Sequence, residues 1–249
     1  MKGYIQEVSI FPPNLSEQKI IAVAQNMSNY FFDNSISASN KIQEIAYEKD
    51  FKGLKKPSRR IIKMSKKKHI DDFFKNGKLH LGSFEYYANF DNSEKGDKIE
   101  GSYILVGRNH VQTVFATLGG SYNNYLFCCF DGEPDKNILK KFDYDDYFEI
   151  TDIDGFRNSI EKSLGANSSD NSRCIYRKHK VLVGETPDNY EFNEISMKLL
   201  SLTNNSKYFL KTSDFEHQNE YRFVWTINQD VSESIILDCP EAIKYCKRK

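Results

Sequence analysis

The chain has 249 residues, 39% apolar and 14% aromatic, which is enough for one sizeable core with an appendage. Its 35 Lys and Arg residues balance 35 Asp and Glu residues, and a formal net charge of zero argues against a nucleic-acid coat protein and against a basic protein of membrane surfaces. No apolar run approaches the roughly 20 residues that span a bilayer, and the first residues lack the apolar core of a signal peptide. We therefore expect a cytoplasmic protein with no membrane partner.

Residues 1–57 are expected to form a helical N-terminal extension. Two prolines precede Ser16, a candidate N-cap, and apolar residues then recur at helical spacing over residues 20–31. A second helix is predicted over residues 42–46. The following stretch holds a glycine and a proline and is typical of a linker, so the main domain is expected over residues 58–249. The extension either packs on that domain or binds a partner.

The main domain opens with a predicted strand, helix and second strand joined by tight connections. The first strand is expected at residues 60–64, and Ser65 can cap a helix that runs to residue 76. Gly77 is a natural helix stop, and the second strand follows at once over residues 78–83.

The rest of the chain is mainly short strands with few long helices. Strands are predicted at residues 103–106, 111–117, 125–130, 147–150, 180–183, 221–227 and 234–237. Helices are predicted at residues 156–164 and 194–202, with a polar loop at 166–173 and a turn at Gly119-Gly120. This order predicts a compact mixed α+β fold and argues against a doubly wound parallel sheet.

Two groups of residues are of the types that bind metals. The five cysteines are an odd set with no C-x-x-C pair, which argues against a disulfide framework and a zinc site. Cys128 and Cys129 lie in an apolar run and are expected to be buried and unreactive. An acidic loop carries four carboxylates, but their spacing is not that of a calcium-binding loop. We expect no metal and a solvated loop at Asp91, Glu94, Asp97 and Glu100.

A polar turn runs straight into a strong strand near the C-terminus. Glu216, Gln218 and Glu220 alternate there, so in extended backbone their side chains point to one side. Where a carboxylate and an amide lie two residues apart, the carboxylate can stabilise positive charge on an anomeric carbon while the amide orients a nucleophile. The same spacing also fits an exposed strand edge with solvated polar residues.

The Gln218-x-Glu220 pair resembles the glutamine-x-glutamate signature of ADP-ribosyltransferases. The strand–helix–strand opening is similar as well, and so are the Leu-x-Leu-Gly-Ser strand at residues 79–83 and the Asp-x-x-Glu-Gly loop at residues 97–101. The resemblance covers residues 58–228 and extends to bacterial proteins of toxin and phage-defence loci. It implies an ADP-ribosyltransferase-like mixed β core with short helices, and NAD as the co-substrate.

The resemblance also implies catalytic roles. Glu220 would be the catalytic glutamate, which holds the nicotinamide ribose and stabilises the oxocarbenium-like centre as nicotinamide departs. Gln218 would orient the acceptor. Ser83, at the end of the second strand, would support Glu220 or the ribose.

The implied NAD contacts lie on the first strand and just after the second. Arg60 or Lys63 would contact the NAD phosphates. Tyr86 and Tyr87 could stack on nicotinamide, because an aromatic face suits a planar cationic ring. The two histidines nearby, at positions 69 and 80, are expected to be structural or exposed.

These motifs leave the acceptor open among protein, RNA and DNA, since the Ser-Thr-Ser segment of better-known subclasses has no counterpart. A basic concentration at residues 66–68 with Arg59 and Arg60 favours nucleic acid slightly, and it equally fits a solvated helix start. The resemblance to toxins implies an antitoxin partner.

Three functional hypotheses follow. The first is a mono-ADP-ribosyltransferase that cleaves NAD and modifies a macromolecule. The second is an NAD glycohydrolase, in which water is the acceptor and free ADP-ribose is the product. The third is a binding or sensor module that recognises a partner or nucleotide without chemistry.

Overall fold

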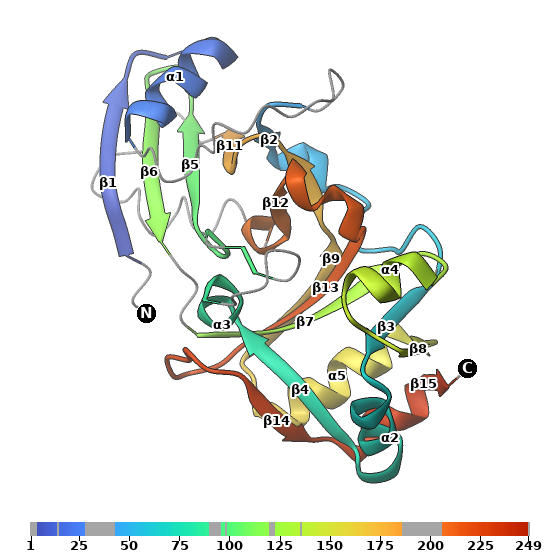
Figure 1. The fold of residues 1–249 in the computed structure, drawn as a ribbon. Helices are drawn as coiled ribbons and strands as arrows, with labels where there is room; N and C mark the ends of the chain where they lie inside the picture. The colour runs from blue at the N-terminus through green and yellow to red at the C-terminus, as the bar shows by residue number, and fades with distance from the viewer. Residues whose placement is uncertain are drawn as a thin grey trace. The chain divides into compact units, whose positions relative to one another are not determined.

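The computed structural model describes residues 4–13, 15–27, 43–89, 96–97, 99–119, 123–134, 136–185 and 206–248 (Figure 1). They belong to two units. The first unit contains residues 1–52, 101–121 and 175–216, and the second contains residues 53–100, 122–174 and 217–249. Both are built mainly from strands with a few helices, which confirms the mixed α+β class.

The first unit is centred on a sheet with the strand order β1-β6-β5-β11-β2. These strands are β1 (Tyr4–Phe11), β2 (Ala46–Tyr47), β5 (Tyr103–Arg108), β6 (Thr113–Gly119) and β11 (Val181–Glu185). Helix α1 (Glu17–Met27) buries Ile20 and Ala24 completely. The unit also holds the short parallel pair β10 (Ile175–Arg177) and β12 (Leu210–Thr212), and the 3-10 turns η1 (Glu48–Phe51) and η3 (Ser206–Phe209).

The N-terminal segment differs from the helical extension expected over residues 1–57. Strand β1 pairs antiparallel with β6, so residues 1–52 share a unit with two segments that lie far along the chain. The first predicted helix is present as α1, and residues 28–42 lie outside the described residues. Ala46 is in strand β2 where a second helix was expected, because pairing with β11 outweighs local propensity.

The second unit is centred on a sheet with the strand order β14-β4-β7-β3-β8-β15, and strands β13 and β9 extend it from the other edge of β7. The strands are β3 (Ile61–Ser65), β4 (Lys78–Ser83), β7 (Asn124–Asp131), β8 (Asp146–Ile150), β9 (Ser168–Arg173), β13 (Glu220–Thr226), β14 (Ile235–Asp238) and β15 (Cys246–Arg248). The helical segments are α2 (Lys67–Asn76), α3 (Phe84–Ala88), α4 (Lys136–Lys141), α5 (Ile153–Leu164) and the 3-10 turn η5 (Pro240–Tyr245). The 3-10 turn η4 (Ser213–Gln218) starts in the first unit, ends in the second and leads into β13.

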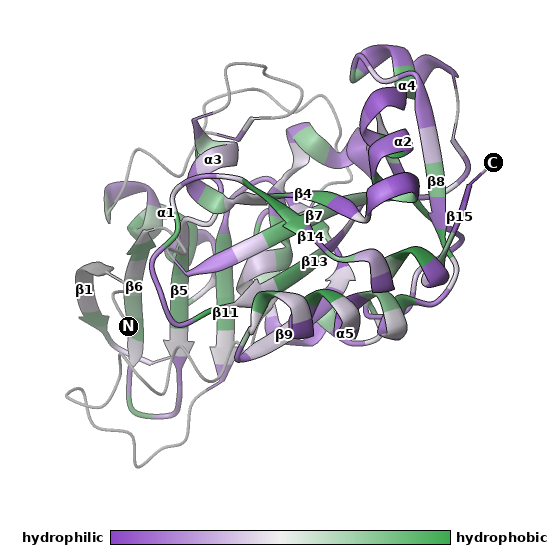
Figure 2. Cartoon of the chain, turned by 90° about the horizontal axis from the view of Figure 1, so that it is seen from below, coloured by the Kyte–Doolittle hydropathy of each residue, from purple (hydrophilic) through white to green (hydrophobic). Residues whose placement is uncertain are grey.

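Helices cover both faces of this second sheet. The larger core joins Phe73 of α2 and Phe156 of α5 to Phe127 of β7 and Phe223 of β13. A smaller core on the other face includes Phe130 of β7, against which α4 packs. Figure 2 shows the result as a largely hydrophobic β7 inside the unit and a hydrophilic outer surface on α2.

The predicted strand–helix–strand opening is confirmed as β3, α2 and β4. Helix α2 begins after Lys66, whose backbone is extended, so Ser65 is not its N-cap. Gly77 ends the helix in the left-handed conformation, at φ 72°, as its position predicts. The other predicted strands and the helix at residues 156–164 are present with slightly different bounds. The helix predicted at residues 194–202 and the second glycine of the predicted turn lie outside the described residues.

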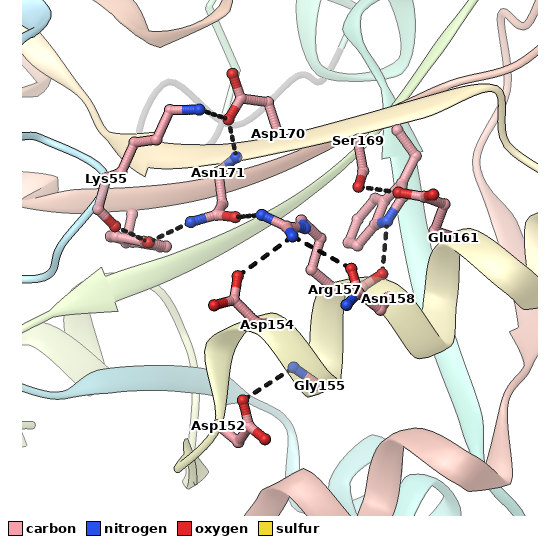
Figure 3. Close-up of polar contacts among 12 residues, drawn as sticks. Lys55, Asp152, Asp154, Gly155, Arg157, Asn158, Glu161, Ser169, Asp170 and Asn171 are labelled. Carbon is pink, nitrogen blue, oxygen red and sulfur yellow. Dashed lines mark hydrogen bonds and ion pairs between the residues drawn. The ribbon is translucent and has the colours of Figure 1, made fainter.

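The prediction of a polar loop at residues 166–173 was wrong, because most of this segment forms strand β9. Its residues are polar, yet its centre is buried beside β13. The Asn171 Nδ2 donates to the Tyr221 hydroxyl at 2.6 Å, and Asn171 Oδ1 accepts from Arg157 Nη1 at 2.7 Å (Figure 3). Polar groups can be buried when their hydrogen bonds are satisfied, and hydropathy alone does not reveal such a strand.

The glycines that end α2 and α5 make a matched test of how closely Pro240 packs against Gly77. An added Cβ at Gly77 would lie 2.5 Å from Pro240 Cα, whereas Gly165 has the same left-handed backbone and nothing within 4 Å. We expect Gly165→Ala to cost about 1 kcal/mol of unfolding free energy and Gly77→Ala to cost about 1–3 kcal/mol more. Urea denaturation of both variants measures the difference, and equal losses would contradict the close approach of Pro240.

Candidate active site at a gap in the second sheet

Strands β3 and β4 pair with the same edge of β7 at opposite ends. Ile61 and Ile62 of β3 pair with Asp131 and Phe130, while β4 pairs only as far as Leu126. Residues 127–129 of β7 therefore lie in a gap between the two strands.

A lysine side chain reaches into this gap. Lys63 Nζ donates a hydrogen bond to the main-chain oxygen of Cys128 at 2.9 Å. The same ammonium lies 4.3 Å from the centroid of the Phe127 ring. Strand carbonyls need a partner when water is displaced, and here a cationic side chain supplies it where a neighbouring strand would normally do so. The gap thus carries a positive charge close to the sheet.

A cavity of about 350 Å³ opens beside the gap, and its volume falls in the usual range of small-molecule sites. One wall comes from α2 and β8 and the other from β4 and α3. The lining residues are Lys63, Ser65, Lys66, His69, Ile70, Asp72, Phe73, Lys78, Leu79, His80, Tyr86, Tyr87, Phe127, Tyr144, Phe148 and Ile236.

The polar lining of the cavity is mainly basic. Lys63, Lys66 and Lys78 contribute three cations, and Lys66 Nζ is paired with Asp143 at 2.6 Å. Desolvation, followed by the positive charges of Lys63 and His69, lowers the pKa of His80 to about 4. The His80 imidazole is therefore neutral at physiological pH and can accept a hydrogen bond. This balance of charge suits an anionic group such as a phosphate.

The aromatic wall depends on one glycine. Ser83 is the N-cap of helix α3, and its hydroxyl accepts from the Tyr86 main-chain N–H at 2.9 Å and donates to the Ser232 carbonyl at 2.7 Å. The rings of Tyr86 and Tyr87 lie edge to face, with their centroids 5.3 Å apart. A Cβ on Gly82 would lie 2.5 Å from Tyr87 Cε2, so only glycine lets this ring lie against β4.

Tyr87 connects the cavity to Glu220. Burial raises the pKa of Tyr87 well above its usual range, and the Cys128 thiol, Tyr144 and the Glu220 carboxylate raise it further. The phenol also hydrogen-bonds Cys128. Tyr87 therefore lines the cavity and stays protonated within electrostatic range of the glutamate.

Glu220 is the first residue of β13, and only 5% of it is exposed. Its Oε1 accepts from Arg222 Nε at 2.6 Å, and Arg222 also binds Glu100 through both Nη atoms, at 3.0 and 3.2 Å. Burial lowers the pKa of Arg222, but the negative charges of Glu100 and Glu220 outweigh it and hold this pKa well above its usual value. The carboxylate is thus fixed in place.

The backbone before Glu220 is not extended, so the expected one-sided row of Glu216, Gln218 and Glu220 is wrong. Residues 213–218 form the 3-10 turn η4, and Asn219 has a positive φ of 40°. The Asn219 carbonyl accepts from the Asp131 N–H at 2.8 Å, which pins the turn to the end of β7. Glu216 is exposed and Gln218 is partly buried.

Among the predicted NAD contacts, Lys63, Tyr86 and Tyr87 meet at the cavity. Arg60 is not one of the described lining residues, because its guanidinium is bound to Glu149 and to Glu133, the latter at 2.8 Å. Ser83 is fully buried and acts as the N-cap of α3.

Several residues of the site had no role assigned from the sequence, and His80 was expected to be structural or exposed. Tyr144 and the neutral His80 line the cavity, and Arg222 holds Glu220. The expectation for the cysteines holds for Cys129, which is buried and has a raised pKa, while Cys128 is only half-buried and contacts Tyr87. The position of Arg222 two residues after Glu220 was the available signal, because i and i+2 share one face of a strand.

The comparison of the chain with protein-family models, curated proteins and solved structures found no match. No helix among the described residues is both long and apolar enough to cross a membrane. Within the same residues, no three His, Cys, Asp or Glu side chains gather as metal ligands would.

The contact between Gly82 and Tyr87 can be tested by a double-mutant cycle. We expect Gly82→Ala to lower the unfolding free energy by about 1–3 kcal/mol, because the new methyl group displaces the Tyr87 ring. In a Tyr87→Ala background the same change should cost less, since most of the obstruction is gone. Urea denaturation of the four proteins gives the coupling energy, and additive losses would show that the ring lies elsewhere.

Proposed function

We propose that this chain cleaves NAD and transfers ADP-ribose to a macromolecular acceptor. The observation that carries the proposal is a row of contacts that joins the cavity to Glu220. The carbonyl of Tyr87, a lining residue, accepts from the Asp97 N–H at 3.3 Å, and Glu100 of the same loop binds the Arg222 side chain that holds Glu220. The Gln218-x-Glu220 resemblance to ADP-ribosyltransferases supports the same function.

The groups that line the cavity support NAD as the ligand. NAD combines a planar, cationic nicotinamide ring with a diphosphate. The faces of Tyr86 and Tyr87 suit the ring, and the ammonium groups of Lys63, Lys66 and Lys78 suit the phosphates. No metal is needed for this arrangement.

The chemistry is a substitution at the anomeric carbon of the nicotinamide ribose. The bond from this carbon to the nicotinamide nitrogen breaks, and its electron pair leaves with nicotinamide. Positive charge then develops on the ribose, where the fixed carboxylate of Glu220 stabilises it. The acceptor supplies an electron pair to the same carbon and loses a proton, and Gln218 is the proposed group that orients it.

The acceptor that we favour is nucleic acid, either RNA or DNA. Lys66 lines the cavity, and Lys67 and Lys68 are exposed in the first turn of α2. Lys67 is partly neutralised by Asp71 at 2.9 Å. Cations beside the cavity would attract a phosphate backbone. Loss of NAD or modification of nucleic acid harms the cell that makes the enzyme, so we propose a toxin or anti-phage effector controlled by an antitoxin.

A nucleotide-binding module without chemistry is the second candidate. It is favoured by the burial of Glu220 and by its tight ion pair with Arg222, since a carboxylate held in this way also serves a purely structural role. The two candidates differ in whether NAD is consumed.

Nicotinamide release from NAD tests the proposal, with total RNA, DNA and cell-lysate protein as acceptors. We expect Glu220→Gln to lower kcat by about 100-fold or more, because the charge that stabilises the ribose cation is lost. Glu216→Gln is the matched control, since Glu216 is exposed on the adjacent turn, and it should keep kcat within about twofold.

The fate of labelled ADP-ribose separates the outcomes. Label retained on RNA or DNA would support the favoured acceptor, and label on protein would correct it. Free ADP-ribose in every reaction would identify a glycohydrolase. A folded wild-type chain that binds NAD without releasing nicotinamide would replace the enzyme with the binding module.

A further inference from the structure

Two charged residues of β13 meet a third, from a distant loop of the chain, in the interior of the second unit. Arg222, Glu220 and Glu100 are exposed by only 1%, 5% and 6%, respectively. Arg222 and Glu220 lie on one face of β13, and Glu100 comes from the acidic loop. Burying charges is costly unless they are paired, so this cluster requires a specific arrangement.

The arrangement uses the two sides of the Arg222 guanidinium differently. Both Nη atoms grip Glu100, at 3.0 Å to Oε1 and 3.2 Å to Oε2, in the planar two-bond geometry that suits arginine. The Nε–H donates to Oε1 of Glu220 at 2.6 Å. Glu100 thereby fixes the plane of the guanidinium, and that plane fixes one oxygen of Glu220.

The acidic loop is built to hold Glu100 in place. The Asp97 main-chain oxygen accepts from the Glu100 N–H at 2.7 Å, and Asp97 Oδ1 accepts from the Ile99 N–H at 3.0 Å. The Asp97 N–H in turn donates to the Tyr87 carbonyl at 3.3 Å. Asp97 is only 4% exposed, so this part of the loop is not the solvated loop expected from the sequence.

The loop, the aromatic wall and Glu220 are therefore linked. The Asp97 contact reaches Tyr87, and the guanidinium carbon of Arg222 lies 5.8 Å from the ring centroid of Phe84, which is on the same helix as the two tyrosines. Glu100 thus contacts the residue that holds Glu220, and its loop contacts the helix that lines the cavity.

We propose that Glu100 and Arg222 are positioning residues that orient the Glu220 carboxylate for the NAD reaction; this inference rests on the proposed function. If Arg222 were paired with Glu220 alone, it would neutralise much of the negative charge that has to face the ribose cation. By sharing the guanidinium, Glu100 leaves more negative charge on Glu220 while Arg222 still fixes its orientation.

The test is Glu100→Gln, measured by steady-state NAD cleavage over a range of pH. Glutamine keeps the size of the side chain and removes its negative charge, so the positive charge of Arg222 then acts more strongly on Glu220. We expect kcat to fall about 10-fold with KM for NAD unchanged within about twofold, because the loss is felt mainly in the transition state. The acidic limb of the pH profile should move to lower pH, since the undiluted positive charge favours ionised Glu220.

Two controls separate positioning from folding. Glu85→Gln removes an exposed carboxylate from α3 and should leave kcat and the pH profile unchanged. Arg222→Lys keeps a cation but loses the two-bond grip, and should also lower kcat. Rates are divided by the folded fraction, measured by circular dichroism.

The outcomes distinguish the two proposals. An active wild type whose Glu100→Gln variant keeps both kcat per folded molecule and the pH profile would overturn the positioning role alone. A loss of folded protein with an unchanged rate per folded molecule would overturn it too. A folded wild type that releases no nicotinamide would overturn the proposed function, and the positioning role with it.

Discussion

The hydrogen bond from the Lys63 ammonium to the Cys128 carbonyl is the contact on which the candidate site depends. Strands β3 and β4 share one edge of β7 and diverge between their points of pairing. A strand carbonyl that has no neighbouring strand needs a hydrogen-bond donor, which is usually another strand or water. A flexible cationic side chain satisfies it and still leaves room beside the sheet, so the gap becomes a charged cavity instead of a closed ladder.

A second buried carboxylate holds the far end of this gap. Asp131 is fully buried and accepts from the Ser58 N–H at 2.8 Å, the Ser58 hydroxyl at 2.9 Å and the Arg59 N–H at 2.9 Å. Its own N–H donates to the Asn219 carbonyl. One residue therefore ties the approach to β3 and the turn before Glu220 to the end of β7. Satisfied buried polar groups of this kind fix a single geometry, which a preorganised site requires.

Local patterns predicted the parts of the fold that local interactions determine. The opening strand, helix and strand were predictable because apolar spacing and Gly77 act over a few residues. Lys63, Tyr86 and Tyr87, which line one cavity, were named from the resemblance to ADP-ribosyltransferases and not from local patterns. Local patterning failed for β1, β2 and β9, whose conformations depend on distant partners or on buried hydrogen bonds. It also could not find Glu100 as the partner of Arg222, since an acidic loop looks the same whether it is solvated or buried.

The most direct test of the central claim is a crystal structure of the chain with a non-cleavable NAD analogue. The account predicts the nicotinamide ring against Tyr86 and Tyr87, with a phosphate oxygen within hydrogen-bond distance of Lys63 Nζ and the ribose facing Glu220. The analogue bound elsewhere on the chain, with the gap between β3 and β4 unoccupied, would contradict it.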